Sequence, residues 1–182
     1  TQYPFRNTLT YRITAEKPVE FTLSVRVPSS ASGIEVDGEK TECKEFLTFR
    51  RVWNGTEEIK IKLDFETNIV KRPNDMVCVW RGPLLYSVAI KEKWEIIEDR
   101  VEFVHGTPHI YPYCDYYIYP MSKWNYALAD DSFIVKENDF ITGYADELPP
   151  VEMTAKMVEI PWGFNHGHCD AVPESREPIS DV

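Results

Sequence analysis

The feature that most constrains the fold of this chain is an alternation of apolar and polar residues with a period of two. It occurs in three segments of the first half, residues 9–15, 19–27 and 59–65. Such a period places one set of side chains on a core face of a strand and the other set in water. Three segments of this kind predict antiparallel sheets with one solvent-exposed face.

Turn residues separate these segments at the expected places. Asp37-Gly38 follows Ile34-Glu35-Val36, and Asn54-Gly55 precedes the strand that begins at Ile59. Both dipeptides tolerate the positive φ angles of tight hairpins. Pro18 and Pro28 bracket the second alternating segment, where a missing N–H is harmless. We therefore expect about seven strands before residue 91, at the spacing of a β-sandwich.

The second half of the sequence is less regular. Residues 94–104, 133–135 and 151–160 have the composition of strands, and no segment shows a sustained helical period. The tail from residue 173 onward is rich in Pro, Ser and acidic residues, and we expect it to be loose. The predicted fold class is all-β, with two packed antiparallel β-sandwich (jelly-roll-like) domains. These domains are residues 1–88 and a loop-rich second domain of residues 89–182.

Net charge argues against a nucleic-acid partner, and the absence of a long apolar run argues against a membrane partner. The formal net charge is −10, whereas phosphate binding needs clustered Lys and Arg, so we expect no nucleic-acid partner. No apolar run approaches the ~18 residues of a membrane span, and we expect no membrane partner. The sequence opens with Thr-Gln-Tyr and no initiator Met, so we expect a piece of a longer protein.

Cysteine and histidine residues do not predict a metal or disulfide framework. The four cysteines are far apart, and we expect reduced, buried thiols at Cys43, Cys78, Cys114 and Cys169. Residues 166–170 (His-Gly-His-Cys-Asp) are the most metal-like cluster. A zinc site needs three or four converging ligands, and the glycine favours an exposed loop instead. We therefore predict no metal site.

Residues 111–126 form an aromatic belt, which consists of Tyr111, Tyr113, Tyr116, Tyr117, Tyr119, Trp124 and Tyr126. Flat aromatic faces stack on sugar rings, so one interpretation is a platform for a glycan. The alternative is that these rings fill the core and a domain interface, and we favour packing for most of them. The residues that we select as candidates for contact with substrate are Trp124, Asn125 and Tyr126.

Carboxylates are abundant but do not predict a catalytic pair. The adjacent pairs are Glu57-Glu58, Asp130-Asp131 and Asp146-Glu147. Glycoside hydrolysis uses two carboxyl groups roughly 5–10 Å apart across the scissile bond. Sequence neighbours on a strand face opposite sides, so we expect these pairs to be solvated surface acids and predict no catalytic residue.

Ordered motifs give a family resemblance. The strongest are residues 81–86 (Arg-Gly-Pro-Leu-Leu-Tyr) and 124–128 (Trp-Asn-Tyr-Ala-Leu), and they stand among residues 21–28, 36–38, 51–55 and 160–162. In this order the chain resembles the C-terminal β region of the β-L-arabinofuranosidase-like glycoside hydrolases (glycoside hydrolase family 127 and its relatives). One departure is Asp37, where the family usually has Asn before the glycine.

The resemblance implies an architecture and a role. Such enzymes have an N-terminal (α/α)6 barrel followed by two β-sandwich domains, and the barrel carries a nucleophilic Cys and a zinc site marked by adjacent cysteines. This chain has no adjacent cysteines, so the resemblance implies no catalytic residue and no cofactor within it. It implies a non-catalytic β-sandwich module of a glycoside hydrolase that acts on plant-type glycans in the bacterial cytoplasm.

The same resemblance implies partners and leaves alternatives open. The barrel of the parent chain is the implied partner, and a second copy of the chain and a glycan are further candidates. Residues 81–86 are interpreted as a corner between the two sandwiches. One alternative is a carbohydrate-binding module that works alone through the aromatic belt. The other is an enzyme with a site that the sequence does not reveal.

Overall fold

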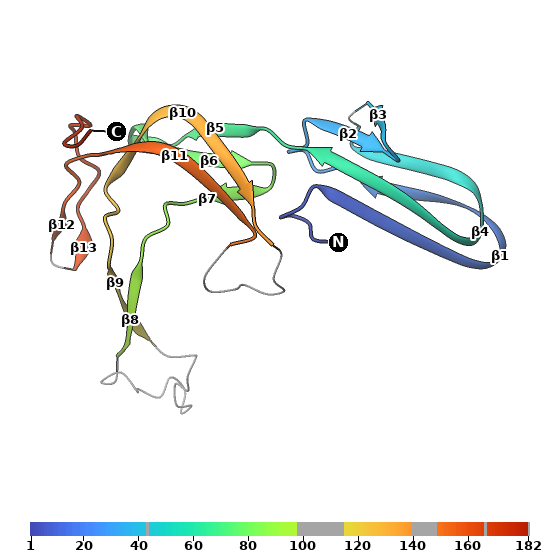
Figure 1. Cartoon of the computed structure of the whole chain (residues 1–182), viewed down its shortest axis with the longest axis horizontal. Helices are drawn as coiled ribbons and strands as arrows, with labels where there is room; N and C mark the ends of the chain where they lie inside the picture. The colour runs from blue at the N-terminus through green and yellow to red at the C-terminus, as the bar shows by residue number, and fades with distance from the viewer. Residues whose placement is uncertain (43, 98–114, 140–148, 166, 182) are drawn as a thin grey trace. The chain divides into compact units, whose positions relative to one another are not determined.

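The computed structural model describes residues 1–42, 44–97, 115–139, 149–165 and 167–181. Apart from one short 3-10 turn, the regular structure of these residues consists of β-strands, which confirms the all-β fold class (Figure 1). Within the same ranges, no helix has the length and apolar character needed to cross a membrane.

The chain divides into two compact units that are not continuous in sequence. Unit 1 contains Thr1–Ser87 and Asp131–Ala155, and unit 2 contains Val88–Asp130 and Lys156–Val182. The ranges 1–88 and 89–182, and the packing of two sandwich domains, remain predictions.

Most strands lie wholly in one unit. Unit 1 contains β1 (Thr8–Arg26), β2 (Gly33–Val36), β3 (Glu39–Thr41), β4 (Phe46–Asp64), β5 (Thr67–Lys71), the 3-10 turn η1 (Pro73–Asp75), β6 (Val77–Arg81) and β7 (Leu84–Tyr86). Unit 2 contains β8 (Glu92–Ile96), β9 (Tyr116–Pro120), β12 (Phe164–Asn165) and β13 (His168–Cys169). The paired strands β10 (Tyr126–Glu137) and β11 (Val151–Glu159) contribute residues to both units.

Two long strands, β1 and β4, dominate unit 1. They pair antiparallel along their whole length, from Thr8↔Lys62 to Arg26↔Phe46, with one irregularity between Ala15 and Val19. The predicted hairpin turn at Asn54-Gly55 is therefore wrong, because β4 continues through Gly55 at a φ of +67°. A glycine at positive φ lets the strand bend without a steric penalty. The two strands predicted on either side of Pro18 are likewise one strand, interrupted only by this irregularity.

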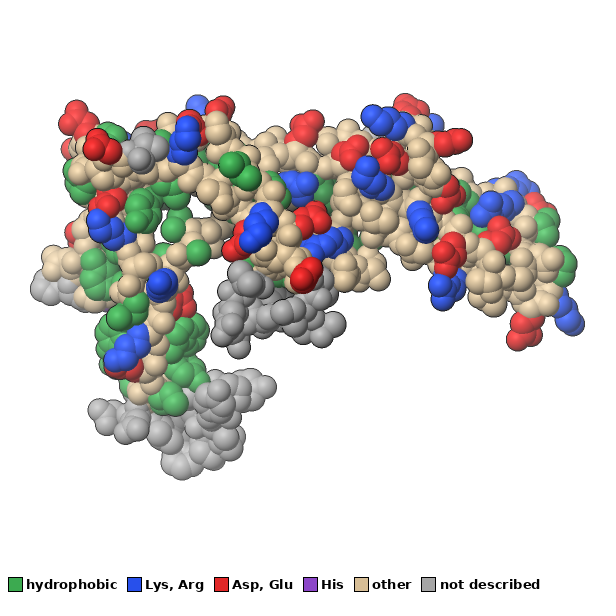
Figure 2. Space-filling view, viewed as in Figure 1, with side chains coloured by type: hydrophobic (Ala, Val, Ile, Leu, Met, Phe, Trp, Pro, Cys, Tyr) green, Lys and Arg blue, Asp and Glu red, His purple; other side chains and the backbone are tan. Residues whose placement is uncertain are grey.

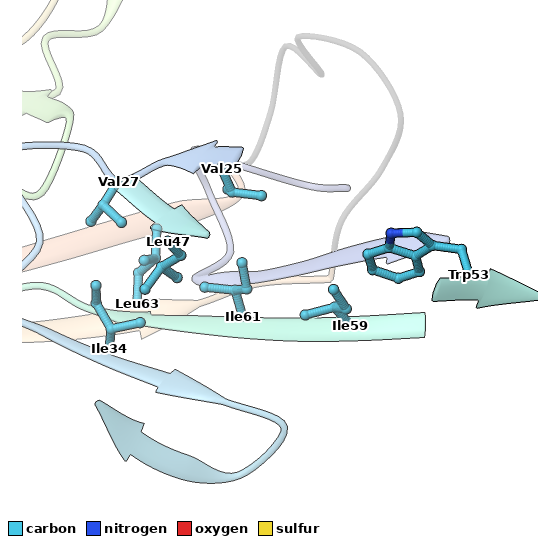
Figure 3. Packing of buried hydrophobic residues seen from close by; sticks show 8 residues of the cluster. All are labelled: Val25, Val27, Ile34, Leu47, Trp53, Ile59, Ile61 and Leu63. Atoms are coloured by element: carbon cyan, nitrogen blue, oxygen red, sulfur yellow. The ribbon is translucent and has the colours of Figure 1, made fainter. Parts of the chain in front are cut away.

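The core of unit 1 lies between the two ends of this long pair. Its buried side chains are Val25 of β1, Val27 just after that strand, Ile34 of β2, and Leu47, Trp53, Ile59, Ile61 and Leu63 from both arms of β4. Partly buried residues of the first arm of β1, among them Leu9 and Ile13, pack against this cluster. Figure 3 shows Val25, Val27 and Leu47 turned toward Ile34, Ile61 and Leu63. One strand pair thus supplies apolar residues to both sides of the core.

The hairpin predicted at Asp37-Gly38 is confirmed. Val36 pairs with Glu39, and the two turn residues have φ angles of +51° and +89°. Two consecutive positive φ angles are the signature of the two-residue hairpin turn for which this dipeptide is suited. The Asp37 carboxylate also accepts a hydrogen bond of 2.8 Å from the backbone N–H of Lys60, which ties the turn to β4.

Residues 81–86 form a tight hairpin within a single sheet rather than a corner between two sheets. Arg81 pairs directly with Leu84, so Gly82 and Pro83 form the turn between β6 and β7 in the three-stranded sheet β5-β6-β7. Gly82 has a φ of +55°, and a Cβ atom there would lie 2.5 Å from the Phe65 ring. Both the turn and the close ring contact explain the glycine.

Unit 2 has a different character. Its β8–β9 ribbon pairs Trp94 with Ile118, and both side chains are half exposed or more. The opposite face carries Tyr117 and Tyr119, which are also exposed. Figure 2 shows hydrophobic side chains along this ribbon, whereas charged side chains of both signs are spread over β1 and β4. A two-stranded ribbon of this kind has little buried apolar area to stabilise it.

Candidate functional site

A shallow hollow of unit 2 lies beside the loop that joins β9 to β10. Its volume is about 550 Å³, and it is wide open to solvent. Pro120 at the end of β9, the loop residues 121–125 and Phe164 of β12 line it. Ligand sites usually have volumes of roughly 300–1,000 Å³, so this hollow is large enough for a small molecule.

Two aromatic rings, Trp124 and Phe164, line this site, and they meet edge-to-face with centroids 6.5 Å apart and an interplanar angle of 68°. Trp162 is not among the lining residues, but its ring stands edge-to-face against Trp124 at 5.3 Å and 64°. The Trp162 indole N–H donates to the backbone oxygen of Asp170 at 2.8 Å, which fixes that ring. We call the two lining rings, Trp124 and Phe164, the aromatic wall.

Backbone hydrogen bonds hold the loop in place. The backbone N–H of Met121 donates to the backbone oxygen of Lys91, and the backbone N–H of Lys91 donates to the Ser122 hydroxyl at 2.9 Å. Asn125 binds Ile160 twice: its side-chain amide donates to the Ile160 oxygen at 2.8 Å, and its backbone oxygen accepts from the Ile160 N–H at 2.9 Å. These bonds give the loop a fixed shape before any ligand arrives.

One charged side chain lines the hollow, and it is already paired. The Lys123 ammonium donates to the Glu159 carboxylate, and this hydrogen bond, followed by the carboxylate charge, raises the pKa of Lys123 above its ordinary value. Lysine therefore stays protonated here, and its charge is balanced locally. The lining as a whole presents aromatic and neutral polar groups.

The structure places two of the three predicted site residues at the hollow and the third outside its lining. Trp124 and Asn125 line the hollow, whereas Tyr126 begins β10, is half buried and is absent from the lining. The sequence prediction missed Phe164 and Trp162, which lie about forty residues further along the chain. A visible signal existed in residues 162–164 (Trp-Gly-Phe), two aromatic residues around a glycine. A Cβ at Gly163 would collide with the Asp170 carboxylate, so the glycine permits this close approach.

The other predicted motifs are only partly described. Tyr111 and Tyr113 of the aromatic belt lie outside the described residues, as does His166 of the metal-like cluster. His168 and Cys169 form the exposed strand β13. Among the residues that the structure describes, no group of three His, Cys, Asp or Glu side chains could hold a metal ion. The prediction of buried cysteines is wrong for Cys169, which is exposed, while Cys78 is half buried and both thiols are free.

Tyr86 at the end of β7 is a second unusual group. Its hydroxyl is buried and has no hydrogen-bond partner within the described ranges. Burial raises the pKa of Tyr86, the positive charge of Arg81 lowers it, and the negative charge of Glu137 raises it. The phenol therefore stays neutral over the physiological range, which is the protonation state of a packing residue rather than of a base.

Comparison with known proteins identifies a relationship for the first third of the chain. Residues 1–65 match the sequence model described as β-L-arabinofuranosidase, GH127 middle domain. This match confirms the resemblance to glycoside hydrolase family 127 for the region of β1 to β4. No curated protein matches the chain.

Two solved structures are also similar to the chain. One is described as a glycoside hydrolase, with 22% identity over 47% of this chain and a TM-score of 0.38. The other is a GH127 β-L-arabinofuranosidase from Geobacillus stearothermophilus T6, with 19% identity over 87% of this chain and a TM-score of 0.40. The chain spans only 16% and 26% of the lengths of these two proteins.

Proposed function

We propose that this chain is a non-catalytic β module of a glycoside hydrolase of the β-L-arabinofuranosidase type that acts on plant-type glycans. The observation that carries the proposal is the match of residues 1–65 to the middle domain of glycoside hydrolase family 127. A domain described as a middle domain works beside other parts of its protein. The expected partner is the catalytic barrel of a parent chain, which would hold the zinc ion and the nucleophile that the resemblance implies.

The carboxylates of unit 1 support a structural role for this region. Glu57 accepts a hydrogen bond from the backbone N–H of Asn54 and pairs with Arg51 at 3.1 Å. Its neighbour Glu58 pairs with Arg12 on β1 at 2.7 Å. These two acids therefore point to different partners across the sheet surface. A glycosidase needs instead two carboxyl groups that converge on one bond.

The environment of Glu152 also supports a structural rather than a catalytic role for its carboxyl group. Its hydrogen bond from the Asn138 amide, followed by the bond from Lys136, lowers its pKa. A general acid in glycoside hydrolysis requires a carboxyl group whose pKa is raised so that it holds a proton at neutral pH. The environment of Glu152 acts in the opposite direction.

A hydrolysis assay tests the absence of catalysis. The 182-residue chain is incubated with an aryl β-L-arabinofuranoside, and release of the aryl group is followed over hours. We expect release at the rate of buffer alone, with or without added Zn²⁺. Turnover that grows with protein concentration and is lost on heat denaturation would contradict the proposal.

An immunoblot tests whether the chain is part of a larger protein. Antibodies raised against the 21.2 kDa chain are applied to an extract of the cells from which the sequence comes. We expect a band several times larger, because the catalytic barrel would be part of the same polypeptide. A single band at the size of the chain would contradict the proposal and favour a module that works alone.

A further inference from the structure

We infer that the hollow beside Trp124 is a binding site for one ring of a neutral saccharide, with the aromatic wall as its stacking surface and Asn125 as its polar contact. This inference concerns unit 2 alone. It rests on the geometry of the hollow and is independent of the identity of any parent enzyme.

The shape of the hollow suits a flat ring with one face covered. Phe164 exposes 53% of its surface, and Met121 on the loop exposes 60%. Trp124 lines the same hollow and is half buried, and Trp162 and Phe164 contact its ring. Exposed apolar surface of this kind is unfavourable in water, and the C–H face of a sugar ring would cover it without needing to bury a charge.

The polar groups of the hollow complement hydroxyl groups. The Asn125 side-chain amide donates to Ile160, which leaves its carbonyl oxygen as an acceptor with no donor in the described part of the chain. The Trp124 indole N–H likewise has no acceptor among those residues. One acceptor and one donor beside an aromatic face match a sugar, whose adjacent hydroxyls both donate and accept.

Charge decides between neutral and anionic saccharides. Lys123 is the cation in the lining, and the Glu159 carboxylate neutralises it. An anionic sugar would gain nothing from this pair and would meet the Glu159 charge, within a protein of formal net charge −10. The fixed loop supports a site that is formed before the ligand binds, because its backbone is already held by Lys91 and Ile160.

Nuclear magnetic resonance titration of the 182-residue chain tests the inference. The probes are three neutral trisaccharides (arabinotriose, xylotriose and cellotriose) and the anionic trigalacturonic acid. The indole N–H resonance of Trp124 is assigned from its loss in Trp124→Phe. We expect at least one neutral probe to shift this resonance in a saturable manner at millimolar concentration, and the acid to bind no more tightly than that probe.

Matched variants then locate the binding. Phe164→Ala removes an exposed ring and should weaken the neutral probe about tenfold, since a lost stacking contact is of that order. Trp124→Ala should abolish the saturable shifts elsewhere in the loop. Trp94→Ala is the control, because it removes a ring that is as exposed as that of Phe164 but lies in the β8–β9 ribbon. Binding by this variant should stay within twofold of that by the unaltered chain.

Three results would overturn the inference. They are no saturable shift of the Trp124 resonance with any neutral probe, equal affinity for Phe164→Ala and the unaltered chain, and binding of the acid at least tenfold tighter than the neutral probes. Should Trp124→Ala fail to fold, Phe164→Ala decides the outcome alone, because its ring is more than half exposed. None of these results bears on whether the chain hydrolyses glycosides.

Discussion

The long β1–β4 pair and the short β8–β9 ribbon contain similar residue types but use them in opposite ways. Trp53 on β4 is fully buried, whereas Trp94 on β8 exposes 56% of its surface. Strands of nineteen residues can bend so that their two arms cover a common core, as β1 and β4 do. Strands of five residues cannot, and both faces of the ribbon remain exposed to solvent.

This difference indicates that the residues that stabilise the fold lie mainly in the region of β1 to β4. All eight members of the buried cluster lie between Val25 and Leu63, inside the region that matches the family domain. The aromatic residues of unit 2 instead gather at an open hollow and along the ribbon. We therefore expect substitutions in the first region to change folding and those in the second to change recognition.

Replacing one tryptophan of each region by alanine tests this comparison most directly. Trp53 stacks on Phe21 at 5.2 Å, donates its indole N–H to the Phe21 backbone oxygen and lies under the Arg51 guanidinium. Trp53→Ala should lower the free energy of unfolding by about 4 kcal/mol. Trp94→Ala should lower it by less than about 1 kcal/mol. Urea denaturation followed by circular dichroism measures both, and equal losses would remove the distinction between the regions.

Substitutions of Gly82 and Gly38 test whether the close approach of Gly82 to the Phe65 ring contributes to stability. Gly82→Ala would place a Cβ against the Phe65 ring at a positive φ, and we expect a loss of about 3 kcal/mol. Gly38→Ala also places a side chain at a positive φ, of +89°, but with open space around the Cβ, and should cost about 1 kcal/mol. Thermal unfolding of the two variants measures the difference. Equal losses would mean that Phe65 moves aside freely.

Arg6 tests how firmly Glu137, Asn138 and Pro150 are held in unit 1. Its guanidinium donates to the backbone oxygens of Pro150 and Asn138 and pairs with Glu137 at 3.5 Å, with only 20% of the side chain exposed. Arg6→Ala should cost about 2 kcal/mol, because two partly buried carbonyl oxygens lose a charged donor. Arg12→Ala is the control, since its exposed pair with Glu58 should contribute less than about 1 kcal/mol.

Denaturant unfolding distinguishes these two arginine variants. Hydrogen exchange of the amides in β10 and β11 should also accelerate in Arg6→Ala and stay unchanged in Arg12→Ala. An Arg6→Ala chain with unaltered exchange there would show that this segment is held by other contacts.

The smallest expected effect is the pH dependence of the stability that Glu152 contributes. Its pKa in the folded chain lies below the ordinary 4.5, chiefly because of the hydrogen bond from Asn138. A lowered carboxyl pKa contributes stability above the unfolded value, and this contribution is lost as the pH falls through the folded-state pKa. Glu152→Gln should therefore be slightly less stable than the unaltered chain at neutral pH, and the difference should vanish once the pH has fallen below the folded-state pKa. Unfolding curves across this range measure it, and a difference that persists in acid would contradict the assignment.

Much of unit 1 could be predicted from the sequence because its strands alternate clearly. The alternation through Leu9, Ile13, Leu23 and Val25 places these apolar residues of β1 against the core, and Asp37-Gly38 forms the predicted turn. What could not be predicted is that Gly55 bends a strand instead of ending it. An Asn-Gly dipeptide suits both roles, and only the partner strand, which pairs on both sides of it, decides between them.

The candidate site was predicted only in part for a different reason. Trp124 and Asn125 were selected because they lie in an aromatic segment, and the structure places both at the hollow. Phe164 reaches the same place through contacts between segments that are far apart in sequence, which no local pattern encodes. Tyr126 belongs to the same aromatic segment, but it begins β10 and is not among the lining residues.

The continuous pairing of β1 with β4 has a consequence for how the first region folds. Because the same two strands supply both sides of the core, a single choice of register fixes both sides together, and a slip by one residue would turn every apolar side chain outward. Arg26 and Phe46 are the paired residues nearest in sequence, whereas Thr8 and Lys62 are the furthest apart. Loop-closure entropy therefore favours pairing that starts at Arg26 and proceeds outward through the bend at Gly55. We therefore expect the pairing of β1 with β4 to bring most of the core together, and the pairing of β2 with β4 to add Ile34.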